Sequence, residues 1–206
     1  MTDYITSSNF KTRHGITTST DDARIAAHIT AASLEVDSIT GRQFGTHTGA
    51  ATDRYFVPDG YRTVRIDDCY EITTVATDED DSGSYATTWT VSTDYQVVPL
   101  NGVGPNGQTG WPVTQLLAVG YTKSFPTCTR RPSVKVTGKW GWAVVPTDVI
   151  EATYLLAHRL FYERDVPSGV VPGSVEFGGV GMRRPWTVER LLAPYIRADR
   201  KLGITG

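Results

Sequence analysis

The sequence is poor in cysteine, has no long apolar run and carries no large excess of either charge. Its two cysteines, Cys69 and Cys128, are too few for a disulfide scaffold and lack the spacing of metal ligands. No segment approaches the roughly 18 to 20 apolar residues of a membrane-spanning helix, and the polar N-terminus does not resemble a signal peptide. We therefore expect a soluble protein made in the cytoplasm, with no membrane partner and with free, buried thiols.

The charges nearly cancel but are unevenly placed. Lys and Arg total 20 against 22 Asp and Glu, a net charge of −2 over 206 residues, so overall charge does not favour nucleic-acid binding. Residues 67–81 contain acidic side chains and no basic one, whereas the segment from Arg183 onward is mainly basic. The acidic stretch is interpreted as a solvated surface with a hairpin tip at Asp78–Gly83, or as a surface facing DNA. The basic segment suits docking to an acidic partner, with a solvated surface as the alternative.

Catalytic and metal-binding motifs are also lacking. The histidines stand on separate predicted elements, without the short spacing of a metal motif: His14, His28, His47 and His158. The glycines of Gly102–Gly107 are spaced like a dinucleotide fingerprint, but Pro105 interrupts them and no helix opens within the motif. No serine-nucleophile signature is present. We predict that the protein is not an enzyme and uses no cofactor and no metal.

Apolar periodicity and capping residues predict four helices: residues 8–14, 20–40, 147–164 and 187–196. In the second, Ile25, Ile29, Ala32, Val36 and Ile39 form one stripe, which indicates one buried face. Gly41 follows as the left-handed residue that ends this helix.

The helix at 147–164 carries two apolar stripes. The first contains Val149, Thr153, Leu156 and Leu160, and the second contains Ile150, Tyr154, Ala157 and Phe161. A surface helix needs only one stripe, so two indicate burial on both sides. This helix is therefore either the central helix of a domain or one shared with a neighbouring subunit.

From about residue 50 the apolar period falls towards two, which predicts short strands. They are placed at Arg54–Val57, Thr63–Asp67, Glu71–Thr77, Thr88–Ser92, Tyr95–Pro99, Gln115–Tyr121 and Ser133–Trp140. Short connections imply an antiparallel sheet or a small barrel. The tryptophans could form a sugar-stacking or base-stacking surface, and burial explains them equally well.

The predicted fold class is α+β, a small helical bundle with an inserted antiparallel β region and an extended C-terminal arm. Residues 1–48 and 141–166 form the helical framework and residues 49–140 the insert. Residues 167–206 form the arm, because 167–185 is rich in Gly and Pro and only a short helix follows. That helix has the character of a docking peptide, and packing back on its own domain is the alternative.

Three segments, in this order, resemble the head–tail connector, or head-to-tail adaptor, proteins of long-tailed bacteriophages. They are the helix from Asp22 ending in Thr40-Gly41-Arg42, the strand Val134–Trp142 with its Gly-Lys-Trp-Gly-Trp sequence, and Val145-Pro146 with the helix to Arg164 and Pro167–Val170. The resemblance implies a structural virion protein in the neck, without catalytic residues. Such proteins form a ring, usually of twelve subunits, that lies beneath the portal, extends the DNA channel and joins the capsid to the stopper and tail.

The resemblance gives the residue patterns a role. The portal-docking candidates are Arg183, Arg184, Trp186, Arg190, Leu191, Leu192, Tyr195 and Arg197. The subunit-interface candidates are Ile150, Tyr154 and Phe161. The expected partners are further copies of the chain, the portal, the stopper or tail-completion protein, and passing double-stranded DNA without sequence recognition. The alternatives are another neck component, a stopper or tail-completion protein, and a monomeric β-rich ligand-binding module.

Overall fold

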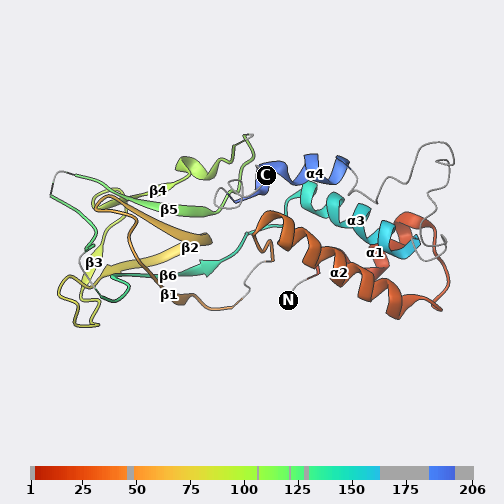
Figure 1. Cartoon of the computed structure of the whole chain (residues 1–206), viewed down its shortest axis with the longest axis horizontal. Helices are drawn as coiled ribbons and strands as arrows, with labels where there is room; N and C mark the ends of the chain where they lie inside the picture. The colour runs from red at the N-terminus through yellow and green to blue at the C-terminus, as the bar shows by residue number, and fades with distance from the viewer. Residues whose placement is uncertain are drawn as a thin grey trace, which may run out of the picture. The chain divides into compact units, whose positions relative to one another are not determined.

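The computed structural model describes residues 3–45, 49–105, 107–120, 122–127, 130–162 and 186–197. The chain divides into two compact units, one made of Met1–Gly45 with Val145–Gly206 and the other of Thr46–Val144. The first contains the described helices and the second an antiparallel sheet (Figure 1). The predicted α+β class is therefore confirmed. Cys128, His47 and most of the predicted arm, including Arg183 and Arg184, lie outside the described residues.

The helical unit contains α1 (Ser7–His14), α2 (Asp22–Thr40), α3 (Thr147–Tyr162) and α4 (Trp186–Leu192), with a 3₁₀ turn at Ala193–Tyr195. α2 lies along α3, and α4 packs on α3 (Figure 1). The side chain of Thr6 caps α1 by accepting a hydrogen bond from the Asn9 amide at 3.2 Å. Gly41 ends α2 with φ +68°, so its predicted left-handed conformation is confirmed.

The core of this unit lies where the apolar stripes of α2 and α3 meet. The predicted α2 residues Ile25, Ile29, Ala32 and Val36 are at most 1% exposed, and Ile39 is half-buried. The first stripe of α3 is also buried at Val149, Thr153 and Leu156. The structure adds residues from both ends of the chain to this core: Tyr4, Phe10, Phe44, Val188, Leu192 and Tyr195.

The C-terminal helix belongs to this core. Val188 and Leu192 are 0% exposed and Tyr195 is 2% exposed. The Tyr195 carbonyl accepts a hydrogen bond from Arg42 Nε at 2.7 Å, and the Arg197 amide donates to the Thr40 carbonyl at 3.0 Å. These buried residues pack on the unit that contains them, which is the alternative given for this helix, and docking to a partner through its exposed residues stays a prediction.

The sheet unit contains β1 (Thr52–Phe56), β2 (Thr63–Thr77), β3 (Thr87–Trp89), β4 (Tyr95–Val98), β5 (Val113–Ala118) and β6 (Val134–Trp140). All named strand pairs are antiparallel, in the order β1-β6-β2-β5-β4, with β3 on β2 (Figure 1). The two strands predicted at Thr63–Asp67 and Glu71–Thr77 are one strand. Its pairing shifts register near Cys69 and between Ile72 and Thr74, as β-bulges do.

The tryptophans of the sheet unit are core residues. Trp89 stacks on Phe125 with ring centroids 4.4 Å apart, and Trp111 meets Trp142 edge to face at 4.8 Å. With Trp140, these tryptophans are 2% to 8% exposed. The interpretation of a stacking surface for sugars or bases is therefore wrong for them, and buried packing is the correct alternative.

The acidic stretch lies mostly within β2 and has local partners. Arg54 donates to Asp67 at 2.7 Å and Lys139 to Glu71 at 2.7 Å. Asp68 is 7% exposed and accepts from Trp142 Nε1 at 3.1 Å. Asp78, at 1% exposure, accepts from the Gly83 amide at 2.7 Å, so the predicted solvated tip is exposed at Glu79 and Asp80 but not at Asp78.

Candidate functional surfaces

The second stripe of α3 is partly covered by α1. Tyr154 lies under the Arg13 guanidinium, whose carbon is 4.6 Å from the ring centroid, and Phe161 meets Phe10 edge to face at 6.0 Å. Ile150, Tyr154 and Phe161 are each half-buried within the chain. The predicted interface residues therefore share a helix face, but α1 already takes up part of it.

Arg13 holds α1 to α3 with two hydrogen bonds to Glu151. Its Nη1 and Nη2 donate to Oε2 and Oε1, each at 2.6 Å, in the bidentate geometry that suits guanidinium and carboxylate. These hydrogen bonds lower the pKa of Glu151. Because both side chains are substantially exposed, the pair orients α1 more than it stabilises the fold.

The outer face of α2 has no charge and was not predicted as a functional surface. Its exposed residues include Ala23, Ala26, Ala27, Ala31 and Leu34, and Leu34 is 41% exposed. The charged residues of the helix are half-buried at its flanks: Asp22, Arg24, Glu35 and Asp37. A surface helix normally presents charge to water, so this uncharged α2 face is unusual. The sequence feature that indicates this face is the run between Arg24 and Glu35, which contains no Asp, Glu, Lys or Arg.

The C-terminal helix presents a small aromatic and basic surface beside its buried side. Trp186 is 68% exposed, and the Arg190 guanidinium carbon lies 5.2 Å from its ring centroid, a cation–π contact. Of the predicted docking residues, Trp186 and Arg190 are exposed, and Leu191 and Arg197 are half-buried. Leu192 and Tyr195 are buried.

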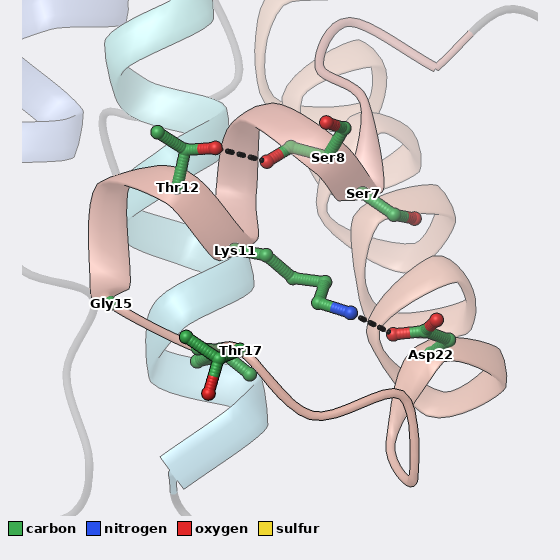
Figure 2. Close-up of a pocket in the computed structure, with 8 residues that line it drawn as sticks. Ser7, Ser8, Lys11, Thr12, Gly15, Thr17 and Asp22 are labelled. Carbon is green, nitrogen blue, oxygen red and sulfur yellow. Dashed lines mark hydrogen bonds and ion pairs between the residues drawn. The ribbon is translucent and has the colours of Figure 1, made fainter.

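An open cavity of about 530 Å³ lies between α1 and the start of α2 (Figure 2). Hydroxyl groups of Ser7, Ser8, Thr12 and Thr17 line it, together with Lys11 and Asp22. Lys11 Nζ pairs with Asp22 Oδ1 at 2.6 Å, and Thr12 Oγ1 donates to the Ser8 carbonyl at 2.9 Å (Figure 2). The two charges that line the cavity pair with each other, so we assign no ligand to it.

Within the described residues, no three metal-ligating side chains gather into a site, and no helix is long and apolar enough to cross a membrane. Cys69 is buried in the sheet unit and free, and its Sγ lies 3.3 Å from the carbonyls of Glu71 and Lys139. Burial raises the pKa of this thiol to about 11, so it stays protonated and unreactive near neutral pH.

The class that these observations define is an α+β protein with a helical unit and an antiparallel-sheet unit. No family model and no curated protein matches the sequence. Among solved structures, the chain is similar to one in the neck of an empty gene transfer agent (GTA) particle computed with C6 symmetry. The TM-score is 0.55 at 14% identity, over 95% of this chain and 90% of that one.

Two further structures agree. One is the neck of a native GTA particle computed with C12 symmetry, with a TM-score of 0.51 at 16% identity, over 93% of this chain and 87% of that one. The other is the virion of a native GTA particle, with a TM-score of 0.53 at 16% identity, over 95% and 90%. The chain is therefore similar in fold to chains of these particles over 93% to 95% of its length.

Proposed function

We propose that this chain is a structural neck protein of a phage-like particle, a head-to-tail adaptor whose copies form a ring beneath the portal. The ring, of about twelve subunits by resemblance, extends the DNA channel and joins the capsid to the stopper and tail. The observation that carries the proposal is the likeness over more than nine-tenths of the chain to chains of symmetric GTA necks. A protein in this position needs surfaces for copies and partners and no catalytic centre. The uncharged α2 face and the Trp186–Arg190 surface are of that kind.

The alternative of a monomeric ligand-binding module loses its main support, because the tryptophans of the sheet unit are buried. A stopper or tail-completion protein would lie in a different layer of the neck from an adaptor, so the position of this chain in the neck distinguishes the two functions. Cryo-EM of a neck reconstituted with portal and stopper should give density for this chain in the layer next to the portal. Density in the layer below, or a chain that stays monomeric beside the portal, would overturn the adaptor proposal.

We further propose that the uncharged α2 face meets the neighbouring copy in the ring, alongside the exposed parts of Ile150, Tyr154 and Phe161. Small residues allow a second element to approach the backbone closely, and Leu34 supplies the largest apolar group. Stable assemblies of this kind commonly bury more than about 2,000 Å² per interface, so this face is one part of the contact.

Leu34→Glu is expected to abolish ring formation while changing the free energy of unfolding of the monomer by less than about 0.5 kcal/mol, because the side chain is exposed. Native mass spectrometry with portal present measures assembly, and urea unfolding measures stability. Val57→Glu is the matched control, since Val57 is an exposed aliphatic residue of the sheet unit. Rings formed equally well by Leu34→Glu and Val57→Glu would show that the α2 face is not an interface.

For the portal we propose a contact through Trp186 and Arg190, with the arginine pairing with portal carboxylates. Deleting the whole C-terminal segment would also remove core residues, so substitution of the two exposed side chains is the sharper test. Trp186→Ala with Arg190→Ala should weaken portal binding at least about tenfold, which surface plasmon resonance measures, and leave unfolding unchanged. Glu189→Ala, at an exposed position of the same helix, is the control. Unchanged affinity in the double variant would exclude this surface.

A further inference from the structure

Two histidines from different helices stack where α1 meets α3. The ring centroids of His14, the last residue of α1, and His158 on α3 are 4.6 Å apart. Each ring has an aromatic neighbour on its own helix. Phe10 lies 4.5 Å from His14, and Tyr162 lies 4.4 Å from His158. Neutral imidazoles pack in this arrangement as ordinary aromatic rings, so at neutral pH the contact holds α1 on α3.

Protonating His14 in this arrangement costs more free energy than protonating a solvent-exposed histidine. Nε2 of His14 is buried and has no hydrogen-bond partner among the described residues. A protonated ring needs acceptors for both of its N–H groups, and here one would be left without a partner. Burial lowers the pKa of His14, and the neighbouring charges of His158 and Arg13 lower it further.

Other charged or titratable groups of the three helices include Lys11 and Arg13 on α1, Asp22, Arg24 and His28 on α2, and Glu151 on α3. Lys11 pairs with Asp22, Arg24 with Asp21, and Arg13 with Glu151. Arg13 holds the pKa of Glu151 below its usual range, so this carboxylate stays charged between pH 7.5 and 5.5. The His28 ring meets Phe161 at 6.3 Å.

One feature favours positive charge at this site, because the C-terminal end of α1 attracts a cation at His14. This attraction is opposed by the buried Nε2 of His14, whose N–H would have no acceptor among the described residues. A proton on His14 is therefore expected to weaken the contact between α1 and α3.

We propose that His14 and His158 form a proton-sensitive latch that holds α1 on α3 at neutral pH and releases it on acidification. The proposal is independent of the neck function. Release of α1 would remove Phe10 and Arg13 from Phe161 and Tyr154 and so uncover the second stripe of α3.

The sign of the pH effect follows from the direction of the His14 shift. A histidine whose pKa is lower in the folded state stabilises the contact above its unfolded value of about 6.5, and the contribution is lost as pH falls below it. Hydrogen exchange of the α1 amides, corrected for the intrinsic rate, should show protection falling more than twofold between pH 7.5 and 5.5, with a ceiling of about tenfold set by the unfolded pKa of about 6.5. The α2 amides of residues 25–36 should stay protected.

His14→Phe keeps a ring in the stack and removes the imidazole whose Nε2 is buried, so this variant should lose less than twofold of α1 protection over the same range. His28→Phe, a histidine of the same unit without an imidazole neighbour, should behave as the unsubstituted protein. The latch is overturned if His14→Phe keeps the full pH dependence or if His28→Phe abolishes it. Parallel loss of α2 protection would also overturn it, because the whole unit would then be unfolding.

Discussion

Replacing Leu192 with alanine is expected to lower the free energy of unfolding of this protein by about 2 to 5 kcal/mol. The side chain is 0% exposed, and α4 packs on α3 with Val188 equally buried, so truncation leaves a cavity in the core of the helical unit. Two hydrogen bonds hold the end of this segment near the end of α2 and limit its collapse into the space: Arg42 Nε donates to the Tyr195 carbonyl, and the Arg197 amide donates to the Thr40 carbonyl. Urea unfolding followed by circular dichroism measures the loss.

Trp186→Ala is the matched control, because the residue stands on the same helix and is 68% exposed. Its free energy of unfolding should change by less than about 0.5 kcal/mol even though a larger side chain is removed. If Leu192→Ala were as stable as Trp186→Ala and lost portal binding instead, α4 would be a docking peptide after all. The prediction that Leu192 stabilises the core of the helical unit would then be contradicted.

The packing partner of α4 could not be predicted from the sequence. The apolar side of the helix is visible in the spacing of Val188, Leu192 and Tyr195. What that side packs on is a tertiary fact, because α3 stands more than twenty residues earlier in the chain and a Gly- and Pro-rich segment separates them. Periodicity reports that a face is apolar and does not identify the surface that covers it.

Elements governed by local chemistry were predicted well. The α2 stripe and the left-handed Gly41 follow from helical spacing and from the absence of a Cβ. The strands were placed within a few residues, but the continuity of β2 was missed. Its bulges near Cys69 and Ile72 interrupt the two-residue alternation on which the strand assignment relied, so one strand was predicted as two.

The candidate surfaces were harder to predict than the elements that carry them. The second stripe of α3 is apolar as expected, yet Phe10 and Arg13 of α1 cover part of it. These side chains therefore pack within the chain, and only their exposed parts are available for contact with another copy. The uncharged α2 face was overlooked because alanine is a good helix former and suggested only helix propensity.

Adding one methyl group in the middle of β6, through Gly138→Ala, is expected to destabilise the sheet unit by about 3 kcal/mol. A Cβ at this position would lie 2.7 Å from the Glu71 carbonyl oxygen and 2.8 Å from Cys69 Sγ. The first contact is with backbone, which cannot rotate away. Gly138 pairs with Thr52 of β1 on one side and Ile72 of β2 on the other, so the shift would part the strands at the centre of the sheet.

Gly60→Ala is the matched control in the same unit, because a Cβ there meets nothing within 4 Å and its backbone has no positive φ. It should change the free energy of unfolding, measured in urea, by less than about 0.5 kcal/mol.

Combining Gly138→Ala with Cys69→Ala removes the sulfur contact and leaves the carbonyl contact, so stability should return only in part. Full recovery would mean that the thiol alone excludes a side chain at Gly138. Equal stability of Gly138→Ala and Gly60→Ala would mean that β2 and β6 do not approach each other this closely. The glycine in the Gly-Lys-Trp-Gly-Trp segment would then need another explanation.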